Sequence, residues 1–169
     1  MARTYKYVGS DDIRLKVAGF PVGTRIKSVR DLETWLAQTK QKPNNWGIIA
    51  ATFVVDEEGY LRIADRHSEH VACAGGGPVL SAGEIFFTYS DQEIEVAEIS
   101  NQSTGFCPEP ESWSQVALAL AQIPLSHPGK FTTEFIFRRC PACGQVNIVK
   151  ECLFLCAVCG TELPEYWNF

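Results

Sequence analysis

The chain reads Cys140-Pro141-Ala142-Cys143-Gly144 and, twelve residues later, Cys156-Ala157-Val158-Cys159-Gly160. Two CxxC pairs within one short segment indicate a metal site, because Zn²⁺ binds four ligands in a tetrahedron and thiolate is a preferred ligand. A glycine follows the second cysteine of each pair and can adopt a positive φ angle, which lets the chain turn around an ion. We therefore expect one structural zinc ion, bound by Cys140, Cys143, Cys156 and Cys159.

The residues around the two pairs fit this prediction. Gln145 to Lys150 and Cys152 to Leu155 are rich in β-formers and predict two short strands. Over residues 137–163 the sequence resembles a zinc ribbon of the rubredoxin-like type with a CPxCG knuckle. Four cysteines complete a tetrahedron, so we expect a closed site that stabilises the fold, with Cys152 not a ligand. Iron in place of zinc, four free thiols, and two disulfides are the alternatives.

The composition is that of a soluble globular protein. With 169 residues, of which 46% are hydrophobic and 21% charged, the chain is long enough for one domain with a core. The first residues lack the apolar core of a signal peptide, and the most apolar run, residues 46–55, is too short to span a bilayer. Outside the CxxC pairs, Cys73, Cys107 and Cys152 make an odd number, which is a poor disulfide framework. We expect a cytoplasmic protein without a membrane partner.

The net charge of −5 is distributed unevenly along the chain. Residues 1–50 carry nine Lys/Arg and four Asp/Glu, whereas residues 51–137 carry three and thirteen. Nucleic-acid binders usually have a basic face, and the N-terminal third and the CxxC segment supply one if their cations lie together. Those cations are Arg3, Lys6, Arg14, Lys16, Lys27, Arg138 and Arg139. We favour the simpler interpretation, in which the basic third complements the acidic middle.

Two amphipathic helices are predicted. The first begins at Ser28, whose hydroxyl can accept the free N–H groups of the first turn, and ends before Pro43. The second begins at Ser112 and ends before Pro124. Apolar residues recur at helical spacing in each, namely Val29, Leu32, Trp35 and Leu36 in the first and Trp113, Val116, Ala117, Leu120 and Ala121 in the second.

The remaining apolar segments predict strands. The longest is Ile48 to Val55, which is mostly apolar and therefore central in a sheet. Hairpin turns are predicted at Asp56 to Gly59 and at Ser90-Asp91-Gln92. Further strands are predicted at Tyr5 to Val8, Ile13 to Val17, Tyr60 to Ala64, Ile85 to Tyr89, Ile94 to Ser100 and Phe131 to Phe137.

These elements predict an α+β fold, in which an antiparallel sheet of about six strands carries two helices. A C-terminal zinc ribbon extends one end of this sheet. The predicted body spans residues 1–136, and residues 137–169 form the ribbon and an aromatic tail. Because the strand before Cys140 runs straight into the first CxxC pair, we expect the two parts to be fused as one unit. The aromatic tail, residues 166–169, should pack back on the body or serve as a tag for a partner.

The loop 66–73 is the best candidate for catalysis. It contains His67, Glu69, His70 and Cys73, and histidine is the side chain that most readily exchanges a proton near pH 7. The histidines and the thiol are suited to a second metal, or Cys73 to a nucleophile activated by His70. A polar loop with locally bonded histidines and a buried cysteine is the plainer interpretation.

A run of uncharged polar residues, Asn101, Gln102, Ser103 and Thr104, suits either a pocket for a neutral polar ligand or a self-capped turn. Three functional hypotheses follow. The first is a non-catalytic adaptor that binds a protein partner, and it is favoured because no catalytic motif is recognised. The second is a small hydrolase or transferase with a site between the 66–73 and 101–107 loops. The third is nucleic-acid binding.

Overall fold

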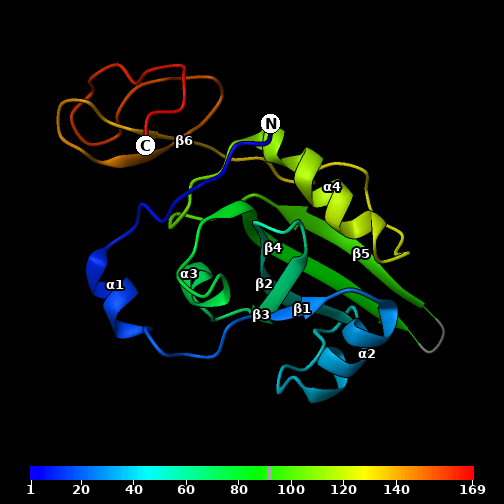
Figure 1. Cartoon of the computed structure of the whole chain (residues 1–169). Coiled ribbons are helices and arrows are strands. Elements are labelled where there is room, and N and C mark those ends of the chain that lie inside the picture. The colour runs from blue at the N-terminus through cyan, green and yellow to red at the C-terminus, as the bar shows by residue number, and fades with distance from the viewer. Residues whose placement is uncertain (91–92) are drawn as a thin grey trace.

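The computed structural model describes residues 1–90 and 93–169. Within these residues a five-stranded antiparallel sheet has the order β1-β3-β2-β4-β5, and β6 and β7 form a separate two-stranded sheet (Figure 1). The strands are β1 Thr24–Ile26, β2 Ile48–Asp56, β3 Leu61–Asp65, β4 Val79–Ser90, β5 Glu93–Ser100, β6 Ile136–Arg139 and β7 Val146–Val149. The helices are α1 Asp11–Lys16, α2 Val29–Gln38, α3 His70–Cys73 and α4 Trp113–Ala121, with a 3-10 turn, η1, at Pro110–Ser112.

The apolar run that begins at Ile48 is the centre of the large sheet, as predicted. β2 lies between β3 and β4, with Phe53 opposite Ile63 on one side and Gly83 on the other. Successive side chains of a strand point to opposite faces, and both faces of β2 are buried: Phe53 and Val54 are each fully inaccessible to solvent. A strand buried on both faces favours apolar residues at nearly every position, which explains the run. The exception, Thr52, places its hydroxyl within hydrogen-bond distance of the Arg66 and Ser68 carbonyls.

Helices cover one face of the sheet and irregular segments cover most of the other. On the first face, Leu32 of α2 and Val116 and Leu120 of α4 pack with Phe53 and Phe87 in the larger core. On the second face, α3 and the N-terminal segment contribute, with Tyr5, Val71 and Phe106 packed around Val54. Figure 1 shows α2 and α4 beside the sheet, α3 within the bend of the chain, and α1 set apart.

The two predicted helices are present, and their starts differ in mechanism. Ser28 caps α2 as expected, since its Oγ accepts the Asp31 N–H at 3.1 Å. Ser112 precedes α4 without a side-chain capping bond, and its Oγ instead shares a hydrogen bond of 2.9 Å with the buried Ser81 Oγ. The predicted capping box at Ser112 is therefore wrong, because the Ser112 hydroxyl bonds the buried Ser81 hydroxyl of the sheet and not an N–H of the first helical turn.

The N-terminal strand prediction is wrong for Ile13 to Val17. These residues lie in or next to α1, which begins after Ser10, whose Oγ accepts the Ile13 N–H at 3.3 Å. Asp11 and Asp12 stand in the first turn and Arg14 and Lys16 in the last, which is the arrangement that the helix dipole favours. Tyr5 forms one isolated bridge to Val79 and is not part of an extended strand.

Several boundaries also differ from the prediction. The chain between residues 65 and 84, expected to be irregular, contains α3 and the first half of β4, and the unpredicted β1 pairs with β3. The strand that leads into the first CxxC pair begins at Ile136 instead of Phe131. Cys152 to Leu155 makes isolated bridges only, through Leu153 and Leu155. In place of the expected six strands and two helices, the described residues form a five-stranded sheet, a two-stranded sheet and four α-helices. Asp91 and Gln92 of the predicted turn lie outside the described residues.

In the described residues, no helix has the length and apolar character needed to cross a membrane.

Gly83 is a position where a side chain would collide with the sheet. A Cβ at this residue would overlap the Ser100 carbonyl oxygen and meet the Asn101 Cα at 3.0 Å. Backbone atoms cannot rotate away, so Gly83→Ala should lower the free energy of unfolding by about 1–3 kcal/mol, which urea denaturation measures. Gly77→Ala is the matched control, because its nearest new contact would lie at 3.9 Å. Equal stability of the two variants would contradict the close approach of β4 to residues 100 and 101.

Candidate metal centre

The sulfur atoms of Cys140, Cys143, Cys156 and Cys159 all lie within 4.8 Å of one another. The Cys140 and Cys159 Sγ atoms are 3.5 Å apart, and those of Cys143 and Cys156 are 3.6 Å apart. A tetrahedral ion with metal–sulfur bonds of about 2.3 Å places its sulfur ligands roughly 3.8 Å apart. The four cysteines are therefore positioned to bind one metal ion.

Two turns of the same construction bring the sulfurs together. In the first turn the Gly144 N–H donates to the Cys140 carbonyl at 3.0 Å, and in the second the Gly160 N–H donates to the Cys156 carbonyl at 2.9 Å. Each first cysteine then donates its N–H across the turn, Cys140 to the Gln145 carbonyl and Cys156 to the Thr161 carbonyl, both at 2.8 Å. Gly144 and Gly160 have φ angles of 77° and 73°, which other residues adopt at a cost, so the predicted role of these glycines is confirmed.

N–H groups surround the sulfur of Cys156. The Val158 N–H lies 3.4 Å away and the Asn147 Nδ2 3.5 Å away. Hydrogen bonds to the charged form favour it, and donors led by the backbone N–H of Cys159 lower the pKa of Cys156 to about 6. A thiolate at neutral pH is the form that a metal ion requires.

Asn147 is a functional residue that the sequence interpretation missed. It lies in β7, and besides its contact with the Cys156 sulfur its Oδ1 accepts the Ala157 N–H at 2.9 Å. The side chain therefore fixes the second CxxC turn, at Cys156 and Ala157, to β7, the strand that follows the first CxxC turn. The sequence shows Asn147 only as a polar residue between the apolar Val146 and Ile148, and the structure shows that it is buried.

The donor set is four thiolates, with no carboxylate, histidine or open position among the described residues of the cluster. Soft thiolate ligands in a tetrahedron suit zinc and also iron. With all four positions taken by the protein, such an ion supports the fold and has no site for a substrate.

Cys152 lies apart from this cluster. It is exposed, and it has a φ angle of 56° at the tip of the connection between β7 and the second CxxC turn. We predict that Cys152→Ser leaves the metal content of the purified protein unchanged, whereas Cys159→Ser reduces it. Elemental analysis of both variants tests this, and a loss of metal from Cys152→Ser would show that the ligand assignment is wrong.

Arg138 connects the CxxC segment, residues 136–163, to the rest of the chain. Only 4% of its side chain is exposed, and both of its terminal nitrogens bond the Glu109 carboxylate, at 2.7 and 3.1 Å. Its Nη2 also donates to the Glu165 carbonyl at 2.7 Å. Arg138 therefore does not contribute to the exposed basic face that was considered as an alternative, because a carboxylate from the loop before α4 neutralises it.

The tail, residues 164–169, packs back on the body. The Trp167 indole N–H donates to the Cys107 carbonyl at 2.8 Å, and its ring meets Tyr5 edge-on with centroids 5.6 Å apart. Asn168 accepts the Arg139 N–H at 2.9 Å and donates to the Arg139 carbonyl at 2.7 Å, as a neighbouring strand would. This confirms the first of the two roles expected for the aromatic end of the chain.

The four residues of the proposed catalytic loop separate into two pairs. Cys73 is buried in α3, and His70, the first residue of the same helix, is half-buried. Burial lowers the pKa of His70, whose Nε2 lies 2.8 Å from the Gly83 carbonyl, and raises the pKa of Cys73 to about 12. At neutral pH the first is an uncharged imidazole and the second a thiol. His67 and Glu69 are exposed and line a cavity of about 440 Å³.

The polar run after β5 is also divided. Asn101 is fully buried; its Nδ2 donates to the carbonyls of Pro108 and Phe135, and its Oδ1 accepts the Phe135 N–H at 2.7 Å. Ser103 is buried and its Oγ accepts the Phe106 N–H. Asn101 therefore joins its loop to residues 108 and 135, and Ser103 caps a turn within its own loop, while Gln102 and Thr104 are exposed.

The loops 66–73 and 101–107 meet at one cavity of about 550 Å³ beside the CxxC segment. Glu69 and Thr104 line it together with Arg139, whereas His67, His70, Cys73 and Asn101 do not. The structure therefore brings together Glu69 of the first predicted loop with Thr104 and Gly105 of the second.

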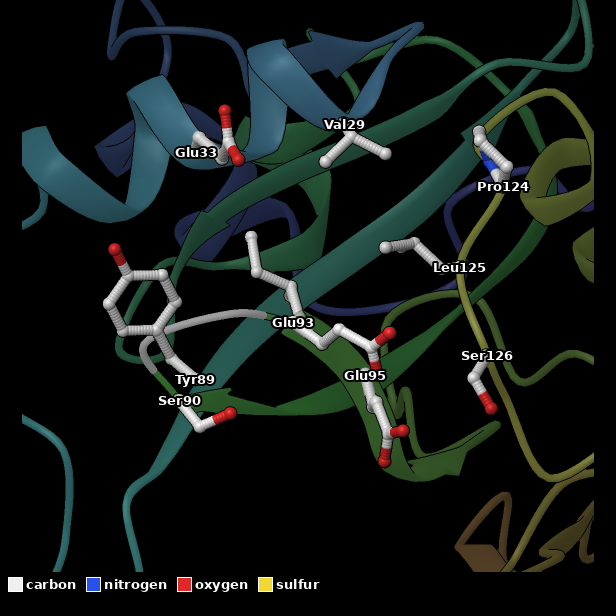
Figure 2. A pocket seen from close by; sticks show the side chains of 10 residues that line it. Val29, Glu33, Tyr89, Ser90, Glu93, Glu95, Pro124, Leu125 and Ser126 are labelled. Atoms are coloured by element: carbon white, nitrogen blue, oxygen red, sulfur yellow. The ribbon is translucent and has the colours of Figure 1, made fainter.

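A separate cleft of about 420 Å³ lies between α2, the ends of β4 and β5, and residues 124–126. Figure 2 shows the carboxylates of Glu33, Glu93 and Glu95 around it, with Tyr89 at one side. These carboxylates are exposed. Glu93 and Glu95 belong to the acidic middle of the chain, whereas Glu33 lies in the N-terminal third.

The chain was also compared with known proteins. No family model, no curated protein and no solved structure matches it.

Proposed function

We propose that the protein is a non-catalytic adaptor that binds a protein partner and whose CxxC segment is a zinc ribbon built on one structural zinc ion. The observation that carries the proposal is the cluster of four thiols within 4.8 Å, which offers a metal ion four ligands from the protein. A closed tetrathiolate site contributes folding free energy and leaves no position for chemistry on a substrate.

The attachment of the ribbon supports a structural role for the metal. Arg138 leads directly into Cys140 and is bonded to Glu109, and Asn168 pairs with the backbone of Arg139. An ion that fixes Cys140 and Cys143 therefore also fixes the strand that carries these contacts. In this proposal the zinc orders the junction between ribbon, tail and body.

The state of the two most reactive side chains supports binding over catalysis. Cys73 holds its proton at neutral pH, and a thiol is a poor nucleophile. The half-buried His70 has its Nε2 at 2.8 Å from a backbone carbonyl of the sheet. Both residues act in the packing of α3 against β2, β3 and β4.

Exposed apolar side chains support a protein partner. Leu153, Leu155 and Val158 of the ribbon are 61%, 44% and 69% exposed, and Phe20 and Val22 of the body are 57% and 49% exposed. Exposed apolar groups that cluster on a surface mark interaction sites. Nucleic acid is not favoured, because Arg138 is buried in an ion pair and Arg14 is paired with Asp11.

Affinity purification of the tagged chain from its source cells tests the proposal. We expect one protein to co-purify in a fixed ratio, to remain after nuclease treatment, and to be lost when a chelator strips the metal. Recovery of nucleic acid in place of a protein, or turnover of a substrate by the purified chain, would contradict it.

A further inference from the structure

We infer that a groove around Phe20 and Val22 binds an extended peptide segment of a protein partner, with apolar side chains in two adjoining cavities and a basic residue beside the second. The two cavities have volumes of about 330 and 440 Å³ and share four lining residues, Val17, Phe20, Val22 and Ala72. We call them together the Phe20 groove. This inference rests on the proposed adaptor function and names the surface and the partner chemistry.

The walls of the Phe20 groove are apolar and accessible. Phe20 and Val22 follow a turn at Gly19, whose φ angle is 83°, and the Phe20 N–H bonds the Val17 carbonyl at 2.9 Å. This turn holds the Phe20 side chain, which is 57% exposed, between the two cavities. Trp35 and Ile63 continue the apolar lining in the second cavity. Burying such side chains against a partner is favourable in proportion to the apolar area covered.

The polar rim of the second cavity is fixed in place by side chains behind it. Thr52, which is buried in β2, places its hydroxyl 3.3 Å from the Arg66 carbonyl and 3.2 Å from the Ser68 carbonyl. The Asp65 carboxylate accepts the His67 N–H at 2.9 Å. Gln41 accepts the Arg66 N–H at 2.8 Å and donates to the Ala50 carbonyl. A rim that is already ordered loses little conformational entropy on binding.

The charge of this rim selects a basic residue. Asp65 and Glu69 both line the second cavity, and neither forms an ion pair within residues 1–90 and 93–169. The first cavity contains Arg14, whose charge is balanced by Asp11 at 2.8 Å. The Phe20 groove therefore has an apolar floor with an excess of negative charge at one end, and a cation that lies there is attracted to the two carboxylates.

The shape of the groove favours an extended chain. The exposed ring of Phe20 stands between two cavities, and alternate side chains of an extended segment lie on one face about 7 Å apart. Thr24 of β1 also lines the groove, and β1 is an edge strand of the sheet. An extended segment can lie along this edge and place two side chains on either side of Phe20.

Nuclear magnetic resonance of the full-length ¹⁵N-labelled protein tests the inference. The probes are three ten-residue peptides, in which leucine alternates with lysine, leucine alternates with glutamate, or serine alternates with lysine. We expect the leucine–lysine peptide to shift the amide signals of Val22, Thr24 and Ala72, and the other two peptides to shift them much less. Absence of these shifts at millimolar peptide would overturn the inference. So would shifts centred on the acidic cleft of Figure 2, because they would show attraction by charge alone.

Two pairs of variants separate the contributions of the groove. Phe20→Ser should weaken binding of the leucine–lysine peptide about tenfold, whereas Leu118→Ser, at an equally exposed residue of α4, should leave it unchanged. Glu69→Gln should weaken it about threefold, and Glu93→Gln in the cleft of Figure 2 should not. Equal effects of the paired variants would overturn the inference.

The same variants identify other occupants. If Phe20→Ser converts a dimer of the purified chain into a monomer in sedimentation experiments, a second copy fills the groove and the inference is wrong. If a partner co-purifies equally with the wild type and with Phe20→Ser, the adaptor function is supported but the inference that the partner binds in the Phe20 groove is wrong.

Discussion

Cys140→Ser should lower the melting temperature of the whole chain in one cooperative step. Structural zinc contributes on the order of 10 kcal/mol in small metal-dependent peptides, and a typical domain is stable by only about 5–15 kcal/mol. Cys140 directly follows β6, whose Arg138 and Arg139 bond to Glu109 and to the tail. Loss of one ligand should therefore disturb the contacts between the CxxC segment and the body as well as the metal site.

Thermal unfolding followed by near-ultraviolet circular dichroism measures this effect, with Trp35, Trp46 and Trp113 reporting on the body. Cys152→Ser is the matched control, because it also removes a thiol from the CxxC segment but lies outside the cluster. If the body signals of Cys140→Ser melt unchanged while the C-terminal segment becomes sensitive to protease, the segment is a separable module. The prediction that both parts form one unit would then be wrong.

Glu109→Ala should be the next most destabilising change, with a loss of about 3–5 kcal/mol in the free energy of unfolding. The variant leaves the Arg138 guanidinium buried without its carboxylate, and desolvated charge without a partner is costly. Glu58→Ala is the control, since its bond to Arg25 involves a carboxylate that is 68% exposed, and such pairs contribute at most about 1 kcal/mol. Urea denaturation of the two variants gives the comparison.

A third variant distinguishes an unpaired charge from a lost packing contact. Replacing both partners at once, as Glu109→Leu with Arg138→Met, removes the charge together with its counter-ion. We expect this double variant to be more stable than Glu109→Ala, because apolar residues of similar volume tolerate burial. A double variant that is less stable than Glu109→Ala would show that the hydrogen bonds from Arg138 to the tail carbonyls are the larger contribution.

The parts of the fold that the sequence predicted are those in which each residue has one structural solution. Residues 48–55 are apolar except for Thr52, which favours burial on both faces, and the cysteines of a CxxC turn are adjacent because the turn is short. The helices α2 and α4 were predicted because their apolar residues recur over more than two turns. In each case the sequence pattern is specific enough to favour one structure over the others.

The predictions failed where the pattern was short or the partner distant. Ile13, Leu15 and Val17 alternate as in a strand, but the five residues 13–17 are too few to separate that period from a helical one. The cap supplied by Ser10 favours the helix. Arg138 was read as an exposed cation because Glu109, its partner, is 29 residues away in the sequence. For Asn101 a ligand pocket and a self-capped turn both stayed open, because its bonds to residues 108 and 135 depend on the tertiary fold.

The most direct test of the account is the metal content of the native chain, purified without added metal and analysed by elemental and native mass spectrometry. The account predicts one zinc per chain and no visible absorption of the kind that iron–thiolate sites show. It also predicts that removal of the ion frees the four thiols of Cys140, Cys143, Cys156 and Cys159. A chain without metal, a disulfide between any two of these cysteines, or iron in a stoichiometric amount would contradict it.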